Sequence, residues 1–147
     1  MNIPNCQYVV FKGVEGFADR LQCLLQVIAY AKKTGRILVI DWRDADWQHS
    51  PLIVLSDYLY LEGINCLSIY EFLTVFTDSP STLSVYPEVW RQEIHKPDFR
   101  DFCRGDQYKL PDNSRAIQAI CDGDRQDFMA DVVVYVGFGL LTSFFTL

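Results

Sequence analysis

The sequence has few of the residues that bind nucleic acids or metal ions. It contains 13 Lys and Arg against 19 Asp and Glu, a net charge of -6, and no run of basic residues. A protein that binds nucleic acid needs clustered cations to neutralise phosphates, so we expect no nucleic-acid partner. There are only two histidines, and the five cysteines form no CxxC pair. Because zinc sites use such closely spaced ligands, we expect no metal site.

Signals for secretion, membrane insertion and serine hydrolysis are also missing. The N-terminal stretch MNIPNCQYVVFK has no basic segment and no cleavage site, so we expect no signal peptide. The uncharged stretch from Val132 to Leu147 is shorter than the roughly 20 apolar residues of a membrane helix, so we expect no transmembrane span. Five cysteines without a disulfide framework are typical of reduced thiols, which predicts a cytoplasmic protein. No G-x-S-x-G elbow is present, so a serine hydrolase is not indicated.

The first part of the chain predicts a strand, a helix and a second strand in close succession. The apolar runs CQYVVFK and RILVIDW are candidate buried strands. Between them, apolar residues recur at spacings of three and four, as on one face of a helix: Phe17, Leu21, Leu24, Ile28 and Ala31. Lysines at 32 and 33 and a glycine at 35 favour the end of this helix. The order predicts a βαβ unit with two parallel strands.

The rest of the chain has weaker patterns. They predict helices over 52–63, 68–76 and 116–120, strands over 83–90 and 131–139, and a loop over 91–115, with Pro87 marking the end of the first strand. We therefore expect one α/β domain over 1–147, Rossmann-like, with a mostly parallel sheet and flanking helices. After the strand over 131–139, we expect the uncharged C-terminal stretch to turn and begin a helix that has neither a cap nor a polar face. We therefore expect the domain to be incomplete at this end.

The loop that opens the first helix, GVEGFADR, has a carboxylate where phosphate-binding loops have a glycine. A dinucleotide fingerprint has the form G-x-G-x-x-G, and from Gly13 its second and third glycine positions hold Glu15 and Ala18. The second glycine lets the backbone approach a pyrophosphate, which a carboxylate would repel. Asp41, at the end of the second strand, does occupy the place of an acid that binds ribose. A dinucleotide-binding domain therefore stays an alternative.

Residues 13–44, GVEGFADRLQCLLQVIAYAKKTGRILVIDWRD, resemble the first βαβ unit of the fucosyltransferase superfamily, which includes nodulation, core and protein O-fucosyltransferases. Nodulation-type members have a similar A-K-x-T-G-R-x-L-x-I-D-W-R run, matched here over 31–43. One branch of the protein O-fucosyltransferases has a loop similar to Glu15-Gly16-Phe17-x-x-Arg20. The resemblance implies the N-terminal half of a two-domain GT-B-type fold. It also implies that a C-terminal, donor-binding domain is missing from this sequence.

The same resemblance implies an activity and a set of site residues. The complete enzyme would transfer fucose from GDP-fucose to a hydroxyl of a glycan or protein, with no metal or other cofactor, and this chain alone would be inactive. Glu15 would be the catalytic base, because transfer requires the acceptor hydroxyl to lose its proton. The expected substrate-binding residues lie in the loop, the first helical turns and the end of the second strand: Gly13, Gly16, Phe17, Asp19, Arg20, Asp41, Trp42 and Arg43.

Purely structural roles are the alternatives for these residues. Glu15 could simply stabilise a helix N-terminus, where negative charge is favoured. Trp42 could stack on a sugar or pack in the core. Arg43 could reach a ligand, or pair with Asp41 or Asp44. For the whole chain, the alternative to an enzyme is a Rossmann-like binding module without catalysis.

Overall fold

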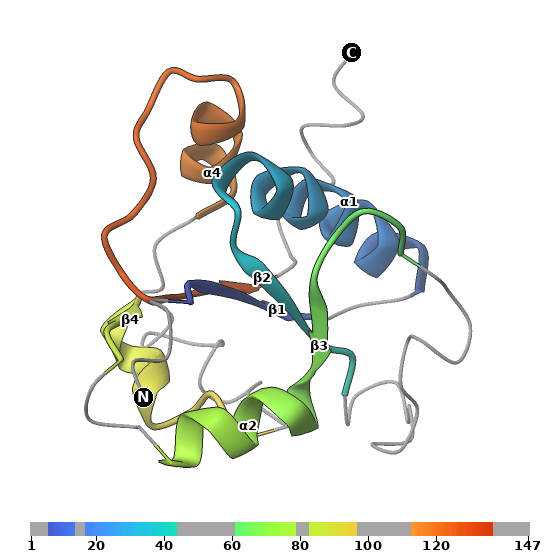
Figure 1. The fold of residues 1–147 in the computed structure, drawn as a ribbon. Helices are drawn as coiled ribbons and strands as arrows, with labels where there is room; N and C mark the ends of the chain where they lie inside the picture. The colour runs from blue at the N-terminus through green and yellow to red at the C-terminus, as the bar shows by residue number, and fades with distance from the viewer. Residues whose placement is uncertain (1–5, 14–16, 44–60, 79–82, 97–112, 137–147) are drawn as a thin grey trace, which may run out of the picture.

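The structure is a computed structural model, and it describes residues 6–13, 17–43, 61–78, 83–96 and 113–136 (Figure 1). The first three elements form the predicted strand-helix-strand unit: β1 (Tyr8–Lys12), α1 (Phe17–Thr34) and β2 (Ile37–Asp41). The elements that follow are β3 (Cys66–Ser68), α2 (Ile69–Asp78), β4 (Val85–Tyr86), the 3-10 helix η2 (Glu88–Arg91), α4 (Asn113–Cys121) and β5 (Val132–Val136).

The five strands form one parallel sheet in the order β3-β2-β1-β5-β4. β1 lies in the middle, and its Tyr8 is in register with Ile37 of β2 and with Val132 of β5. All of β1 is buried, and so is most of β5, as is typical of parallel strands that are covered on both faces. The predicted α/β fold, with a Rossmann-like parallel sheet and flanking helices, is confirmed.

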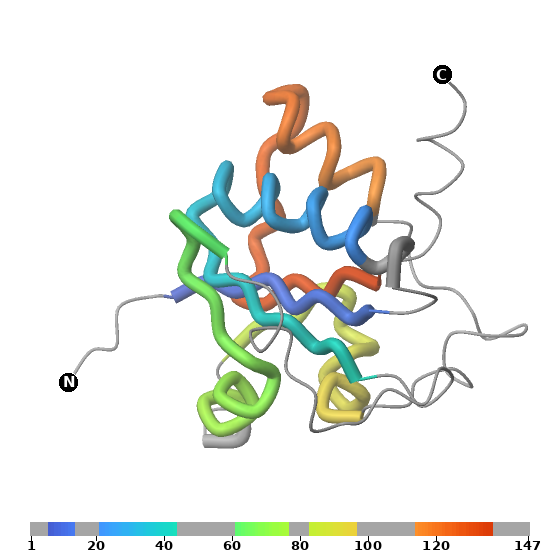
Figure 2. The backbone as a smooth tube through the Cα atoms, turned by 90° about the vertical axis from the view of Figure 1, so that its right-hand side faces the viewer, coloured from blue at the N-terminus to red at the C-terminus, as the bar shows by residue number. Residues whose placement is uncertain are grey.

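Helices cover both faces of the sheet: α1 and α4 lie on one face, and α2 and η2 on the other (Figures 1 and 2). Successive residues of a strand point to opposite faces. Accordingly, Val9 and Phe11 belong to the apolar core beneath α1 and α4. Tyr8 and Val10 belong to the second core, which α2 and η2 complete. The short apolar run of β1 therefore supplies both cores at once.

The side of the sheet on which each α-helix lies follows from the direction of its crossover. The steps from β1 to β2 and from β4 to β5 cross the sheet in the same direction, and their helices, α1 and α4, share one face. The step from β3 to β4 runs the opposite way, and α2 lies on the opposite face. The three crossovers therefore have one hand, as the strong preference for right-handed parallel connections requires.

α1 ends where its sequence predicts. Lys32 and Lys33 lie in its last turn, where positive charge is favourable to the helix dipole. Gly35 follows with φ of 76° and donates its N–H to the carbonyl of Ala31 at 2.8 Å. A left-handed backbone at this position is easy for glycine and strained for other residues. The chain can then turn directly into β2.

Other predicted elements are only partly confirmed. The helix expected over 68–76 is α2, and the strand that contains Val85 does end just before Pro87. The residues beyond that proline, which the strand pattern over 83–90 also covered, are not extended, because Glu88–Arg91 forms η2. The loop predicted to extend to 115 is also wrong at its end, since α4 begins at Asn113. Of the helix predicted over 52–63, only 61–63 is described and is not helical. The chain after 136 lies outside the described residues.

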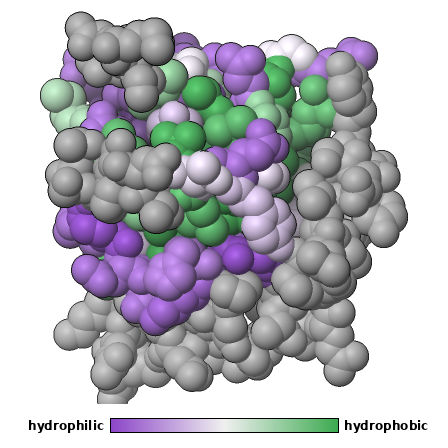
Figure 3. Space-filling model, turned by 60° about the horizontal axis from the view of Figure 1, so that its bottom comes forward, coloured by the Kyte–Doolittle hydropathy of each residue, from purple (hydrophilic) through white to green (hydrophobic). Residues whose placement is uncertain are grey.

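The face formed by α2 and η2 exposes several large apolar side chains. Tyr70 and Val75 of α2 and Val89 of η2 are between 39% and 48% exposed. Figure 3 shows hydrophobic side chains in the middle of this face, with hydrophilic side chains beside them.

Among the described helices, none combines the length and apolar character needed to cross a membrane.

Candidate functional site

The described members of the predicted site lie at the carboxyl edge of the sheet. Gly13 directly follows β1 and donates its N–H to the carbonyl of Asp41, the last residue of β2, at 3.0 Å. α1 runs back across the sheet from this edge, so its N-terminus lies there too (Figure 2). Trp42 and Arg43 continue from β2. The βαβ unit thus brings both ends of the predicted loop to the edge where α/β proteins bind ligands.

The predicted catalytic residue is not among the described residues. Glu15 and Gly16 lie in the segment 14–16, which the structure does not describe. Phe17, Asp19 and Arg20 belong to the first turns of α1, but only their backbone is described. Roles for these five residues therefore stay predictions.

The carboxyl edge contains a buried charge cluster made by Lys12, Asp41 and Arg43. The Nζ atom of Lys12 is 2.6 Å from Asp41 Oδ2, and Arg43 Nε is 2.8 Å from Asp41 Oδ1. The exposed fractions of the three residues are 0%, 1% and 7%. Isolated buried charges are very unfavourable, so each of these groups depends on its partners.

The carboxylate of Asp41 has no acceptor position left. Oδ1 accepts from the backbone N–H of Arg43 at 3.2 Å and from its Nε at 2.8 Å. Oδ2 accepts from Lys12 Nζ at 2.6 Å and from Arg43 Nη2 at 3.0 Å. A carboxylate has about four acceptor positions, and these bonds use all of them. A direct bond from Asp41 to a ligand, as predicted for substrate binding, would require one of the four to break.

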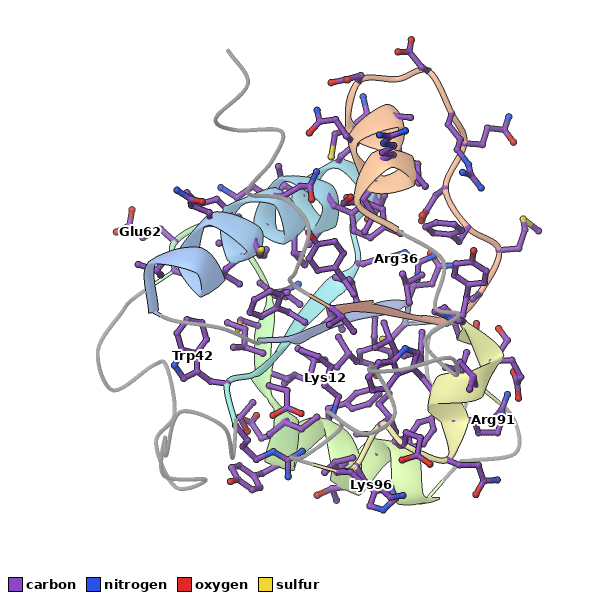
Figure 4. The ribbon with its side chains drawn as sticks, turned by 180° about the vertical axis from the view of Figure 1, so that it is seen from behind. Lys12, Arg36, Trp42, Glu62, Arg91 and Lys96 are labelled. Carbon is purple, nitrogen blue, oxygen red and sulfur yellow. The ribbon has the colours of Figure 1, made fainter. Side chains whose placement is uncertain are left out.

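The two cations of the cluster also fix a segment that is distant in sequence. Lys12 Nζ donates to the carbonyls of Ile94 and Lys96, the latter at 3.1 Å. Arg43 Nη2 donates to the carbonyl of His95 at 3.1 Å. Three successive carbonyls of the segment after η2 therefore point at the ends of β1 and β2. Figure 4 shows Lys12 and Lys96 on the same side of the sheet, near α2.

Aromatic rings complete the surroundings of both cations. Lys12 Nζ lies 5.8 Å from the centre of the Trp90 ring, which η2 contributes. The guanidinium carbon of Arg43 lies 5.6 Å from the centre of the Tyr70 ring, at the start of α2. A cation over an aromatic face is stabilised by the negative charge density of the ring. The layer below the sheet therefore contributes to the charge cluster through both of its helices.

Trp42 is packed in the core. It is 5% exposed and belongs to the core beneath α1 and α4, with its ring 6.3 Å from that of Phe11. Of the two interpretations open for Trp42, the structure shows core packing. Figure 4 shows this residue near the carboxyl edge, well separated from Arg36 at the other end of the sheet.

A second buried charge group lies at that opposite, amino edge. Arg36 Nε is 2.9 Å from Asp127 Oδ2, and the other oxygen of this carboxylate accepts from the Tyr30 hydroxyl. Arg36 also donates to the carbonyls of Tyr8 and Phe128 at 3.1 and 3.0 Å. Burial, and then the hydrogen bond to Asp127, raise the pKa of Tyr30 above its usual value. This group ties α1 and β1 to the segment before β5, and it lies away from the candidate site.

Two parts of the site were missed by sequence reasoning. Lys12 was treated only as the end of an apolar strand, although a lysine that continues such a strand into the core requires a buried anion. Its strand partner Asp41 is that anion, and the parallel register could have indicated this pair. The carbonyls of residues 94–96 carry no sequence signal, because every residue has one.

The described residues contain no group of three or more His, Cys, Asp or Glu side chains that could hold a metal ion. No family model matches the chain, and neither a curated protein nor a solved structure matches it. The parallel sheet, with a buried charge cluster at its carboxyl edge, is therefore the basis for a functional proposal, together with the likeness seen in the sequence.

Proposed function

We propose that this chain is the N-terminal part of a glycosyltransferase that moves fucose from GDP-fucose to a hydroxyl of a glycan or protein. The likeness of residues 13–44 to fucosyltransferases supports the proposal. One structural observation carries it: the parallel β1–α1–β2 unit brings Gly13, the start of α1 and the end of β2 to one edge of the sheet. Ligands of open α/β sheets bind at this edge.

In this proposal, Glu15 is the general base. It accepts the proton of the acceptor hydroxyl as the hydroxyl oxygen forms a bond to C1 of fucose. The bond from C1 to the diphosphate breaks, and GDP leaves with its electron pair. A carboxylate in the loop between Gly13 and α1 is suited to this task because the hydroxyl must lose its proton during transfer. Arg20, one turn into α1, would position the donor or contact its phosphates.

The hydrogen bonds of Asp41 favour this proposal over dinucleotide binding. An acid at the end of the second strand binds dinucleotides by accepting hydrogen bonds from ribose hydroxyls. The two oxygens of Asp41 already accept four bonds from Lys12 and Arg43. In the transferase proposal Asp41 has a different task, which is to hold these two cations at the edge of the site.

The test measures release of GDP from GDP-fucose in the presence of glycan acceptors. It uses the protein together with any sequence that its gene encodes beyond Leu147. We expect acceptor-dependent turnover, and we expect Glu15→Gln to lower kcat by about 100-fold or more, the usual contribution of a general base. The matched control is Glu62→Gln, because Glu62 is an exposed glutamate in the segment before β3. The control should leave kcat unchanged.

Two results would contradict the proposal at different levels. Wild-type turnover in Glu15→Gln would show that Glu15 is not the base, and a stabilised helix N-terminus would then explain it. Absence of turnover of GDP-fucose by the complete protein, with a panel of glycan and protein acceptors, would refute the transferase itself.

A further inference from the structure

We propose that Arg43 is a preoriented contact for a phosphate group, made through its Nη1 atom at the carboxyl edge of the sheet. The identity of the ligand as a nucleoside diphosphate rests on the proposed function. The anion contact itself rests on the geometry of Arg43, whose side chain is 9% exposed.

The guanidinium group of Arg43 is held in place from several directions. Its Nε and Nη2 atoms bond to the two oxygens of Asp41, at 2.8 and 3.0 Å, in a bidentate pair. Nη2 also donates to the carbonyl of His95 at 3.1 Å, and the group lies over the Tyr70 ring. A bidentate pair fixes the plane of the guanidinium as well as its position. Little side-chain freedom is therefore left to lose when a ligand binds.

The remaining donors of this group belong to Nη1. A guanidinium has five N–H donors, one on Nε and two on each terminal nitrogen. The bonds to Asp41 and His95 use those of Nε and Nη2. Nη1 has no acceptor in the described part of the chain. Asp41 cannot supply one, because its four acceptor positions are occupied.

An oxyanion is the ligand group that suits this nitrogen. Arginine stays protonated at all relevant pH values, and its hydrogen bonds to phosphate oxygens are charge-assisted. Arg43 Nη1 is not among the buried side-chain atoms that lack a partner, so solvent or a ligand can reach it, and an anion there replaces water with charge-assisted hydrogen bonds. Arg43 lies two residues after the end of β2, where α/β sheets place their ligand contacts. The phosphates of a nucleoside diphosphate meet these requirements.

The experiment titrates the full chain with inorganic pyrophosphate, GDP, guanosine and malonate, and follows the side-chain guanidinium NMR resonances of Arg43. We expect pyrophosphate and GDP to shift these resonances and guanosine to leave them unchanged. Arg43→Gln should weaken pyrophosphate binding by about 10-fold or more, the loss expected for a charge-assisted hydrogen bond. The matched control is Arg91→Gln, which removes the same charge from η2, where Arg91 pairs with Glu88. It should bind pyrophosphate like the wild type.

Several results would overturn the inference. One is that pyrophosphate leaves the Arg43 guanidinium resonances unchanged. Another is that Arg43→Gln binds pyrophosphate with the affinity of the wild type. A response to malonate with none to pyrophosphate would overturn the assignment to phosphate. If Arg43→Gln does not fold, the wild-type resonances and the variant Arg43→Lys decide, and we expect weaker pyrophosphate binding in Arg43→Lys because it lacks the planar fork.

Failure of this inference can be distinguished from failure of the proposed function. Pyrophosphate binding at Arg43 in a complete protein that does not turn over GDP-fucose would support the anion contact and refute the transferase. Turnover of GDP-fucose together with unchanged pyrophosphate binding in Arg43→Gln would refute the contact and support the transferase.

Discussion

Lys12 and Asp41 are paired residues in the parallel register of β1 and β2, and their side chains form a buried ion pair of 2.6 Å. Partners in a parallel ladder point to the same face of the sheet. Lys12 therefore lies on the side of Tyr8 and Val10, facing η2, and Asp41 meets it there. The last residue pair of this ladder therefore connects β1 and β2 to the layer formed by α2 and η2.

Asp41 is expected to be essential for stability. Replacing it with Asn keeps its shape but removes the anion between Lys12 and Arg43, so two buried cations lose their shared partner. We expect the free energy of unfolding to fall by about 3 to 5 kcal/mol, measured by urea denaturation. The control is Glu88→Gln, which removes an exposed carboxylate paired with Arg91. This variant should unfold like the wild type, and equal stability of Asp41→Asn would contradict the central role of the cluster.

The contribution of Lys12 should depend on Asp41. Lys12→Met retains most of the side-chain volume but removes the donor to Asp41, Ile94 and Lys96. In a double-mutant cycle with Asp41→Asn, we expect a coupling energy of about 1 kcal/mol or more, since the two groups contact directly. Effects of the two substitutions that simply add would show that this ion pair is energetically unimportant.

Tyr30 should make stability fall steeply in alkaline solution. Burial and the bond to Asp127 raise its pKa in the folded protein above the usual value of about 10. Its contribution is fully present below pH 10 and is lost as pH rises above that, because the unfolded chain then ionises first. We expect the free energy of unfolding to fall less steeply in Tyr30→Phe than in the wild type above pH 10. The difference in slope is at most about 1.4 kcal/mol per pH unit, and parallel curves would contradict the raised pKa.

Trp42 should contribute to stability through packing. Trp42→Ala would leave a cavity between β2 and the core under α1, where the ring now lies near Phe11. We expect a loss of about 3 to 5 kcal/mol in the free energy of unfolding and a smaller loss in Trp42→Phe. Unchanged stability of Trp42→Ala, measured by urea denaturation, would return the sugar-stacking interpretation to consideration.

The elements that sequence reasoning identified well are those whose signal is local. α1 has a long apolar periodicity, basic residues in its last turn and a glycine after it, and each of these acts within a few residues. β3 was missed because it has only three residues, with Cys66 exposed, and it forms by pairing with Leu38 and its neighbours in β2. A strand this short forms because the edge of β2 is available for pairing, and its own sequence carries little signal. η2 was missed because the pattern over 83–90 suits a strand as well as a strand followed by a turn.

The candidate site was also predictable only in part from the sequence. The sequence indicated that Asp41, Trp42 and Arg43 end a buried strand, and α/β sheets bind their ligands at the ends of such strands. It did not indicate that all acceptor positions of the Asp41 carboxylate would be occupied, because this depends on how many donors lie near it in the folded protein. Arg43 had several possible partners, and the structure shows its bidentate pair with Asp41.

By itself, the sequence determined the βαβ unit, the two-sided burial of its strands and the position of its loop, because hydrophobic periodicity and turn residues act locally. Only the tertiary structure decided how the buried charges are satisfied. The carbonyls of Ile94 and Lys96 lie more than 80 residues from Lys12 along the chain, yet they accept its hydrogen bonds. A buried cation requires such acceptors, but any backbone carbonyl can serve, so folding alone determines which ones do.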